Sequence, residues 1–244
     1  MKKNLLSSLI AMFSVNILLA QIVVFSPVKV EQNDIEQFIN VEMNYSKKIA
    51  QDAVNNGKLL GWVLMQNTNV GPDDYNFMWV NAYPTIEIAA NENAWWSHSE
   101  KVVGIKPDVL FSDSSKYKYD RSYTYKMQMS IPNTGPAAYV ILNFATPDDV
   151  NAVAASSKKY VIPHFKKNMS DNGMVGWGMA TKITPQGQEY SSMMTYDSYD
   201  SLKNAMKHLA GEGIIEGLPM DKLTKVTWEM RPIMKVISST TEKE

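Results

Sequence analysis

The stretch GKLLGW at residues 57–62 returns as NGMVGW at residues 172–177, and this recurrence decides the fold. The two glycine-tryptophan pairs lie 115 residues apart, and Tyr75 and Tyr190 lie apart by the same number. A repeat period above about 100 residues indicates a duplicated domain rather than a solenoid of short units. The sequence therefore predicts two diverged copies of one folding unit.

Both copies show the same order of predicted elements. Runs rich in β-branched and aromatic residues predict strands, and apolar residues at helical spacing predict helices. For the first copy (21–131) we expect strand 22–30, helix 35–53, strands 61–66 and 75–81, helix 84–97 and strand 122–130. For the second copy (132–240) we expect strand 139–144, helix 150–165, strands 176–182 and 190–196, helix 199–210 and strand 226–237. The order β-α-β-β-α-β predicts an α+β fold built from two ferredoxin-like units, each with both helices on one face of an antiparallel sheet.

Two such units in tandem, each with a glycine-tryptophan pair leading into its second strand, resemble the dimeric α/β-barrel superfamily. The nearest groups are the NIPSNAP-like and antibiotic-biosynthesis-monooxygenase-like domains. The resemblance implies a pseudo-dimer in which two sheets enclose a cleft and one chain completes the barrel. Members include cofactor-free oxygenases, haem-degrading enzymes, haem-dependent chlorite-dismutase-like proteins and proteins without assigned chemistry. Fold alone therefore does not identify a reaction.

Haem is an open cofactor assignment that the residues do not favour. The sequence has three histidines, His98, His164 and His208, and two arginines, Arg121 and Arg231. None of them can be matched by motif to the haem-ligating histidine and nearby arginine of chlorite-dismutase-like members. The asparagine, tryptophan and histidine on which haem-degrading members rely cannot be placed either.

The first 20 residues have the order of a secretory signal peptide. Lys2 and Lys3 precede an uncharged, mostly apolar run over 5–19, and Ala20 follows. The alternative is an uncleaved membrane anchor, because residues 22–25 prolong the apolar run toward the roughly 20 residues that a spanning helix needs. We prefer cleavage, which predicts a secreted or periplasmic mature protein without a membrane segment.

Charge and cysteine content exclude several functions. The formal net charge is −1, and removing residues 1–20 takes away two lysines and no acid, which makes it −3. The lysines are scattered, so we expect no nucleic-acid partner, since binding to a duplex needs clustered cations. The chain has no cysteine, which excludes disulfides and thiolate chemistry. No group of residues has metal-ligand spacing, and we expect no metal site.

The candidate ligand-binding residues lie mainly on two strand faces. Side chains alternate along a strand, so Trp177 and Met179 share one face, and Trp62 lies on the equivalent face of the first copy. Tyr75 and Tyr190 are expected to face the same way on the neighbouring strands. A face that points between the sheets would line an aromatic cleft for an apolar ligand, whereas a face that points to the helices would be core.

His164 completes the candidate site. His164, late in its predicted helix, is the best histidine for a ligand or base; the alternative is a half-exposed helix residue without a catalytic role. Gly178 beside Trp177 leaves more room than Val63 beside Trp62. We therefore expect a pocket at Trp177 and packed core at Trp62. Residues 104–121 form a long loop that is either disordered or functional.

Three functions stay open. The first is an exported protein that binds a small apolar molecule or a protein partner in the inter-sheet cleft. The second is a cofactor-free oxygenase-like or haem-using enzyme of the same superfamily, and the third is a purely structural or interaction protein. Whether the chain is an enzyme, and whether it is a monomeric pseudo-dimer or a homodimer, is not decided by the sequence.

Overall fold

The computed structural model describes residues 22–71, 74–91, 94–112, 117–119, 121–187 and 189–241. The predicted signal peptide over 1–20 lies outside the described residues. Residues 22–25 belong to a strand that pairs with two neighbours. Within the described ranges, the helices are all too short or too polar to cross a membrane.

The first half runs from β1 to β5. Its elements are β1 (Ile22–Lys29), η2 (Gln32–Asp34), α1 (Ile35–Val41), η3 (Glu42–Ser46), α2 (Lys47–Asn55), β2 (Gly61–Asn67), β3 (Phe77–Tyr83), α3 (Ile86–Ala89), η4 (Trp95–His98), α4 (Ser99–Val103), α5 (Pro107–Leu110), β4 (Lys118–Tyr119) and β5 (Tyr123–Ile131). The first strand, first helix and last strand are close to their predicted bounds.

The second half runs from β6 to β10. Its elements are β6 (Tyr139–Ala145), α6 (Val150–Ser156), η6 (Ser157–Val161), α7 (Ile162–Asn168), η7 (Ser170–Asn172), β7 (Met174–Thr184), β8 (Met193–Tyr199), α8 (Leu202–Leu209), η8 (Gly213–Ile215), η9 (Met220–Lys222), β9 (Trp228–Met230) and β10 (Ile233–Ser239). Asp149 starts α6 by accepting hydrogen bonds from the backbone N–H groups of Asn151 and Ala152.

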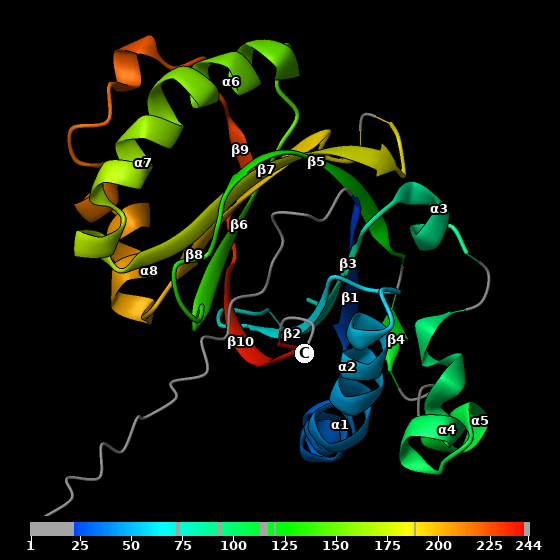
Figure 1. The fold of residues 1–244 in the computed structure, drawn as a ribbon. Coiled ribbons are helices and arrows are strands. Elements are labelled where there is room, and N and C mark those ends of the chain that lie inside the picture. Colours follow the sequence, from blue (N-terminus) through cyan, green and yellow to red (C-terminus); the bar gives the residue numbers. More distant parts are fainter. Residues whose placement is uncertain are drawn as a thin grey trace, which may run out of the picture.

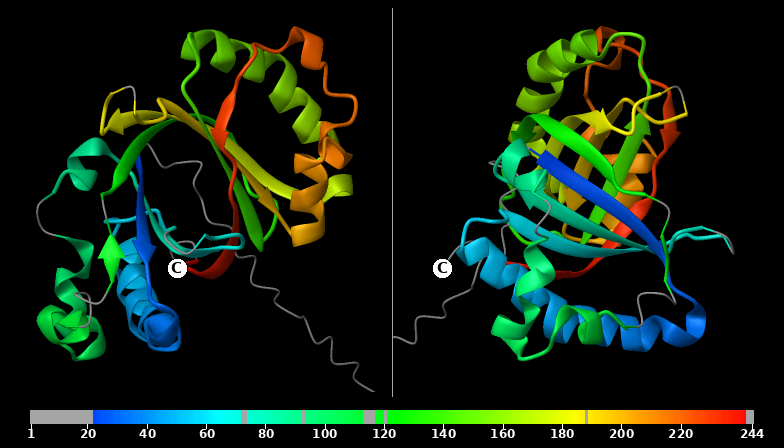
Figure 2. Two further views of the ribbon diagram at one scale, coloured as in Figure 1. Left: turned by 180° about the vertical axis from the view of Figure 1, so that it is seen from behind. Right: turned by 90° about the vertical axis from the view of Figure 1, so that its right-hand side faces the viewer.

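Eight antiparallel strands close into a barrel (Figure 1). The first half has the strand order β5-β1-β3-β2, and the second half has the corresponding order β10-β6-β8-β7. The last strand of each half pairs with the second strand of the other, β5 with β7 and β10 with β2. The helices of the two halves cover opposite outer sides of the barrel (Figure 2). The α+β barrel expected from the sequence is confirmed.

Side chains from both halves fill the interior of the barrel. Inward-facing residues of all eight barrel strands form one buried cluster that contains Val23, Phe25, Val63, Met65, Val80, Ala82, Tyr125, Val140, Leu142, Ala180, Met194, Tyr196 and Met234. The predicted inter-sheet cleft is therefore wrong, because this packed core occupies its place. Two further clusters lie outside the barrel, between each half of the sheet and its own helices.

The two long helical stretches share two local features. Each contains a π-helical turn, η3 in the first half and η6 in the second, a feature often found near functional sites. An Asn-Gly pair follows each stretch, and Gly57 and Gly173 have φ values of 71° and 63°, which suit glycine.

Several predicted elements differ from the structure. The single helix over 84–97 is wrong, since the described part holds only the short α3 and η4. The strand predicted over 226–237 is divided into β9 and β10. Segment 104–121 includes α5 and β4, although residues 113–116 and 120 lie outside the described residues.

Candidate functional site

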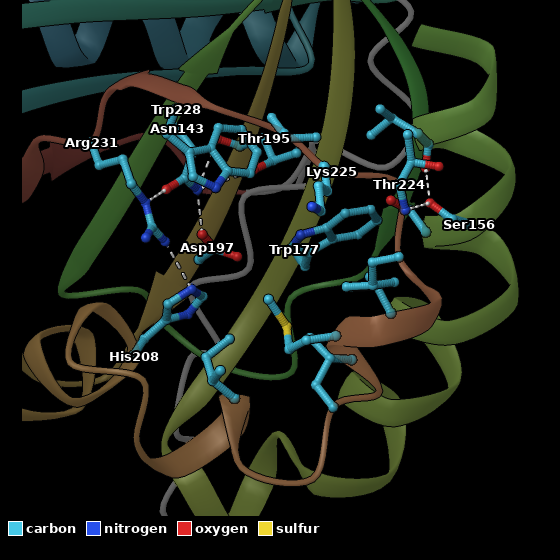
Figure 3. A pocket seen from close by; sticks show the side chains of 18 of the residues that line it. Asn143, Ser156, Trp177, Thr195, Asp197, His208, Thr224, Lys225, Trp228 and Arg231 are labelled. Carbon is cyan, nitrogen blue, oxygen red and sulfur yellow. Dashed lines mark hydrogen bonds between the residues drawn. The ribbon is translucent and has the colours of Figure 1, made fainter. Parts of the chain in front are cut away.

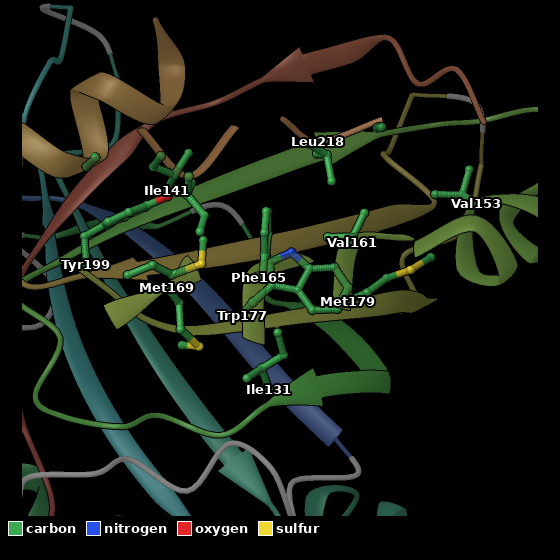
Figure 4. Packing of buried hydrophobic residues seen from close by; sticks show 14 of the residues in the cluster. Ile131, Ile141, Val153, Val161, Phe165, Met169, Trp177, Met179, Tyr199 and Leu218 are labelled. Atoms are coloured by element: carbon green, nitrogen blue, oxygen red, sulfur yellow. The ribbon is translucent and has the colours of Figure 1, made fainter. Parts of the chain in front are cut away.

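A cavity of about 520 Å³ lies in the second half, between the outer face of the sheet and the helical layer (Figure 3). Strands β6, β7 and β8 form its floor, and α6, η6, α7 and residues 211–228 cover it. Its apolar walls come from Val153, Val161, Phe165, Trp177, Leu209, Ile215, Leu218, Leu223 and Val226. Phe165 and Trp177 meet edge to face, with ring centroids 6.2 Å apart (Figure 4).

The strand register explains why a cavity can form in this half. Trp62 pairs with Asn81, and Trp177 pairs with Asp197. Asn81 on β3 therefore corresponds to Asp197 on β8. Two residues earlier on these two strands, Trp79 corresponds to Thr195. An indole in the first half is thus replaced by a much smaller side chain in the second.

The helices show the same difference in size. Glu42 and Ser157 begin the two π-helical turns, and each lies 20 residues before the tryptophan of its half. In the first half Trp79 Nε1 donates a hydrogen bond of 3.0 Å to Glu42, and the Trp79 ring packs on Phe38 with centroids 5.7 Å apart. The second half has Ser157 and Val153 at the corresponding positions, and both line the cavity. Three smaller residues thus leave the space that the first half fills.

A hydrogen-bonded polar network forms one wall of the cavity. Asn143 Nδ2 donates to Asp197 Oδ2 and to Thr195 Oγ1, the latter at 3.0 Å. Arg231 Nε donates to Asn143 Oδ1 at 2.6 Å. Arg231 also reaches His208, with 3.1 Å between Nη2 and Nε2. The network holds the outward-facing side chains of β6 and β8 in fixed positions.

His208 is held as a neutral ring by its surroundings. Burial lowers the pKa of His208, and the neighbouring Arg231 lowers it further, although the Asp197 charge opposes both. Because Arg231 can only donate, Nε2 is the acceptor, and Nδ1 carries the proton that faces Tyr199 Oη. Both ring nitrogens of His208 are therefore engaged.

The segment that covers the cavity is attached at both ends. His164 Nε2 lies 2.8 Å from the carbonyl oxygen of Ile214 and holds η8 against α7. Thr224 Oγ1 donates to the carbonyl of Ala152 at 3.1 Å, which ties the far end to α6. Between these points, Gly217 has a φ of 75°. His164 thus positions the cover and does not itself line the cavity.

No protein-family model matches the sequence, and no curated protein matches it. Solved structures do match. A "putative monooxygenase" from Lactobacillus acidophilus superposes with a TM-score of 0.57 at 12% identity, covering 92% of this chain and 97% of that one. A chlorite dismutase mutant from Candidatus Nitrospira defluvii gives 0.52 at 7% identity, covering 89% and 91%. A haem-binding protein from Thermus thermophilus gives 0.53 at 11%, with the same coverage.

The chain has the dimeric α/β-barrel fold. The matches extend over 91–97% of those chains. Identities of 7–12% establish the fold and carry no reaction with them.

The dimeric α/β barrel separates most of the candidate residues that the sequence suggested. Trp177 lines the cavity, and Met179 lies in the same buried cluster without lining it. Trp62 is buried against the helices of the first half. Tyr75 lies two residues before β3 and is half-buried.

Tyr190 lies at an end of the barrel, away from the cavity lining. It precedes β8, and its ring lies 5.3 Å from the ammonium nitrogen of Lys182. The Lys182 nitrogen also lies 5.4 and 5.5 Å from the rings of Tyr123 and Tyr125. Burial lowers the pKa of Lys182 to about 8, while the Glu229 charge opposes this shift. This cluster closes the interior and is separate from the residues that line the cavity.

Sequence reasoning missed the polar wall. Asn143 lies on a predicted strand and Asp197 directly follows one, but no motif distinguishes either from other polar residues. Arg231 and His208 were considered only as haem residues. The available signal was the comparison of repeats: Asp197 stands where the first half has Asn81, and Thr195 stands where it has Trp79. No cluster of three metal-binding side chains occurs in the described part of the chain.

Proposed function

We propose that this protein binds a small, largely apolar molecule in the cavity of its second half. The single observation that carries the proposal is the exchange of Trp79 and Glu42 in the first half for Thr195 and Ser157 in the second. A protein that binds no ligand could fill the space between sheet and helices with large side chains in both halves. Here one site is packed, and its counterpart is a cavity of about 520 Å³ that is lined mainly by apolar side chains and has a polar network on one wall, the usual form of a ligand site.

We also propose that the mature protein is exported and arose by tandem duplication. Export is supported by the order of residues 1–20, and by β1, which begins at Ile22 and would remain whole after cleavage at Ala20. Duplication is supported by the equal strand orders of the halves and by the equivalent pairings of Trp62 and Trp177. Because one chain closes the barrel, a monomeric pseudo-dimer suffices for the fold.

The haem-using alternative draws on neighbours described as a chlorite dismutase and a haem-binding protein. The residues around this cavity do not fit a haem held by histidine. Axial coordination needs a free ring nitrogen. Both nitrogens of His208 are engaged, and His164 lies outside the lining with Nε2 beside the Ile214 carbonyl. We therefore propose a site that needs no haem.

Calorimetric titration with 1-adamantanol, a compact apolar probe, tests the proposal. We expect saturable binding of one molecule per chain. Thr195→Trp should abolish it, because the indole would fill the cavity as Trp79 fills the first half. Thr195→Val is the matched control: it removes the hydroxyl but keeps the volume, and should still bind. Equal binding by the wild type and Thr195→Trp, with both folded by circular dichroism, would refute the site.

A further inference from the structure

We propose that the ligand of this cavity carries a hydroxyl group that donates a hydrogen bond to Asp197, so that the site selects apolar alcohols over ethers and anions. This inference rests on the proposed function. It names the chemical class of the ligand from the donors and acceptors that the polar wall presents.

The first step concerns the two oxygens of Asp197. The residue is 2% exposed and lines the cavity. Asn143 Nδ2 donates to Oδ2, whereas the other oxygen points into the space in front of Trp177 (Figure 3). A ligand that fills this space would remove that carboxylate oxygen from water, which is costly unless the ligand donates a hydrogen bond to it. The wall therefore presents an acceptor that a ligand donor can satisfy.

The second step concerns the hydrogen-bond donors of the polar wall that could have reached the second oxygen of Asp197. Asn143 Nδ2 is already shared between Asp197 and Thr195. Arg231 directs Nε to Asn143 and Nη2 to His208. The proton on His208 Nδ1 faces Tyr199. These assigned donors are directed elsewhere, so the free position at Asp197 calls for a donor from the ligand.

The third step concerns charge. An anionic ligand group would lie against the Asp197 carboxylate, and like charges repel strongly in a buried site. A cationic group would be attracted by Asp197 but would share the wall with Arg231. A neutral hydroxyl donates one hydrogen bond without either repulsion. Most of the remaining lining residues are apolar and suit a hydrocarbon body, although Ser156, Ser157, Thr224, Lys225 and Thr227 also line the cavity.

A ligand series on the wild-type protein tests the inference without any variant. 1-Adamantanol, 1-methoxyadamantane, adamantane-1-carboxylate and 1-adamantylamine share one body and differ only in the polar group. We expect the alcohol to bind at least about tenfold more tightly than the ether, the range for a hydrogen bond to a charged group. We expect the carboxylate to be the weakest ligand.

Asp197→Asn provides the matched variant. Its side-chain oxygen is expected to stay toward Asn143, which turns the amide NH₂ toward the cavity and replaces an acceptor with a donor. The preference of the alcohol over the ether should therefore disappear.

The outcomes separate the two proposals. If none of the four compounds binds, the proposed function fails and this inference fails with it. If the alcohol and the ether bind equally, the cavity is a ligand site and the role of Asp197 is wrong. Tighter binding of the carboxylate would assign recognition to Arg231 instead, and tighter binding of the amine would assign it to an ion pair with Asp197; either result overturns the hydroxyl assignment.

Discussion

Thr195 and Asp197 occupy neighbouring outward-facing positions of β8, and together they convert a packed site into a candidate binding site. Their first-half counterparts, Trp79 and Asn81, lie at the same register positions beside Trp62. The smaller side chain at 195 leaves volume, and the carboxylate at 197 gives that volume a polar wall. Two side chains on one strand thus differ in both size and charge between the halves.

Glu42 leads to a prediction about pH. Burial raises the pKa of Glu42 to about 7, although the hydrogen bond from Trp79 opposes the shift. The ordinary pKa of this carboxyl group is 4.5. Between pH 4.5 and pH 7, the folded state therefore keeps a proton that the unfolded state has released. The free energy of unfolding therefore falls as pH rises through this window, by about 3 kcal/mol for such a shift.

The variant Glu42→Gln should remove this contribution, because the amide stays neutral at every pH. Urea unfolding at pH 5 and pH 8 measures the effect. We expect the wild type to lose more stability than Glu42→Gln between these two values, and the variant to be the more stable protein at pH 8. Parallel losses in the two proteins would show that Glu42 does not titrate in this range.

The two repeat tryptophans should respond differently to truncation. Trp62 is 1% exposed within a packed cluster, so Trp62→Ala should cost about 3–5 kcal/mol. Trp177→Ala should cost less, because the face of its ring on the cavity has fewer atoms in contact to lose. It should also weaken 1-adamantanol binding. Denaturant melts of both variants measure the costs, and an equal cost would mean that Trp177 is packed on all sides.

At the scale of elements, β7 is shaped by its partner β8. Gly178 pairs with Tyr196, and a Cβ added at Gly178 would lie 2.3 Å from the Tyr196 ring. The sequence expectation that Gly178 leaves room beside Trp177 is therefore wrong: the tyrosine ring occupies that room inside the barrel. The cavity lies on the opposite face of the sheet and depends on Thr195.

This pairing predicts a steric cost. Gly178→Ala should destabilise the protein by about 1–3 kcal/mol, the range for overpacking a filled core. Combining it with Tyr196→Leu, which removes the ring, should cost less than the sum of the two single changes. Thermal melts of the three variants test the coupling. If the cost of the double variant equals the sum of the two single costs, the Tyr196 ring moves aside freely when Gly178 is replaced.

Element order was predictable, whereas several boundaries were not. The strands, the first helix of each half and the Asn-Gly helix ends follow from periodicity and turn chemistry. The prediction of one strand over 226–237 followed its alternating apolar and polar residues and passed over Pro232, whose missing N–H marks the break between β9 and β10. The paired strands begin two to three residues later than predicted, since Tyr75 and Tyr190 are aromatic residues in loops.

At the scale of the whole molecule, the fold was predictable and most of the site was not. The recurring sequence pattern predicted two ferredoxin-like units and therefore the barrel. It could not say which sheet face met the helices, because both faces are apolar: Val63 and Met65 point inward while Trp62 and Leu64 point outward. The pocket can be placed on the outer face of the sheet only once it is known that side chains fill the interior of the barrel.

Export makes a prediction for the whole chain. Cleavage after Ala20 should give a mature protein that begins at Gln21 or within a few residues of it. Intact-mass measurement on the natively secreted protein tests this. Retention of Met1 would support the membrane-anchor alternative instead.

The central claim is that the second half holds a ligand site and the first half a filled counterpart. A crystal structure grown with 3-bromo-1-adamantanol tests it most directly, because anomalous scattering locates the bromine. We predict one bromine peak per chain, between Trp177 and the segment over 211–228, with the hydroxyl next to Asp197. A peak inside the barrel or beside Trp79, or no peak in the cavity at a saturating concentration, would contradict the account.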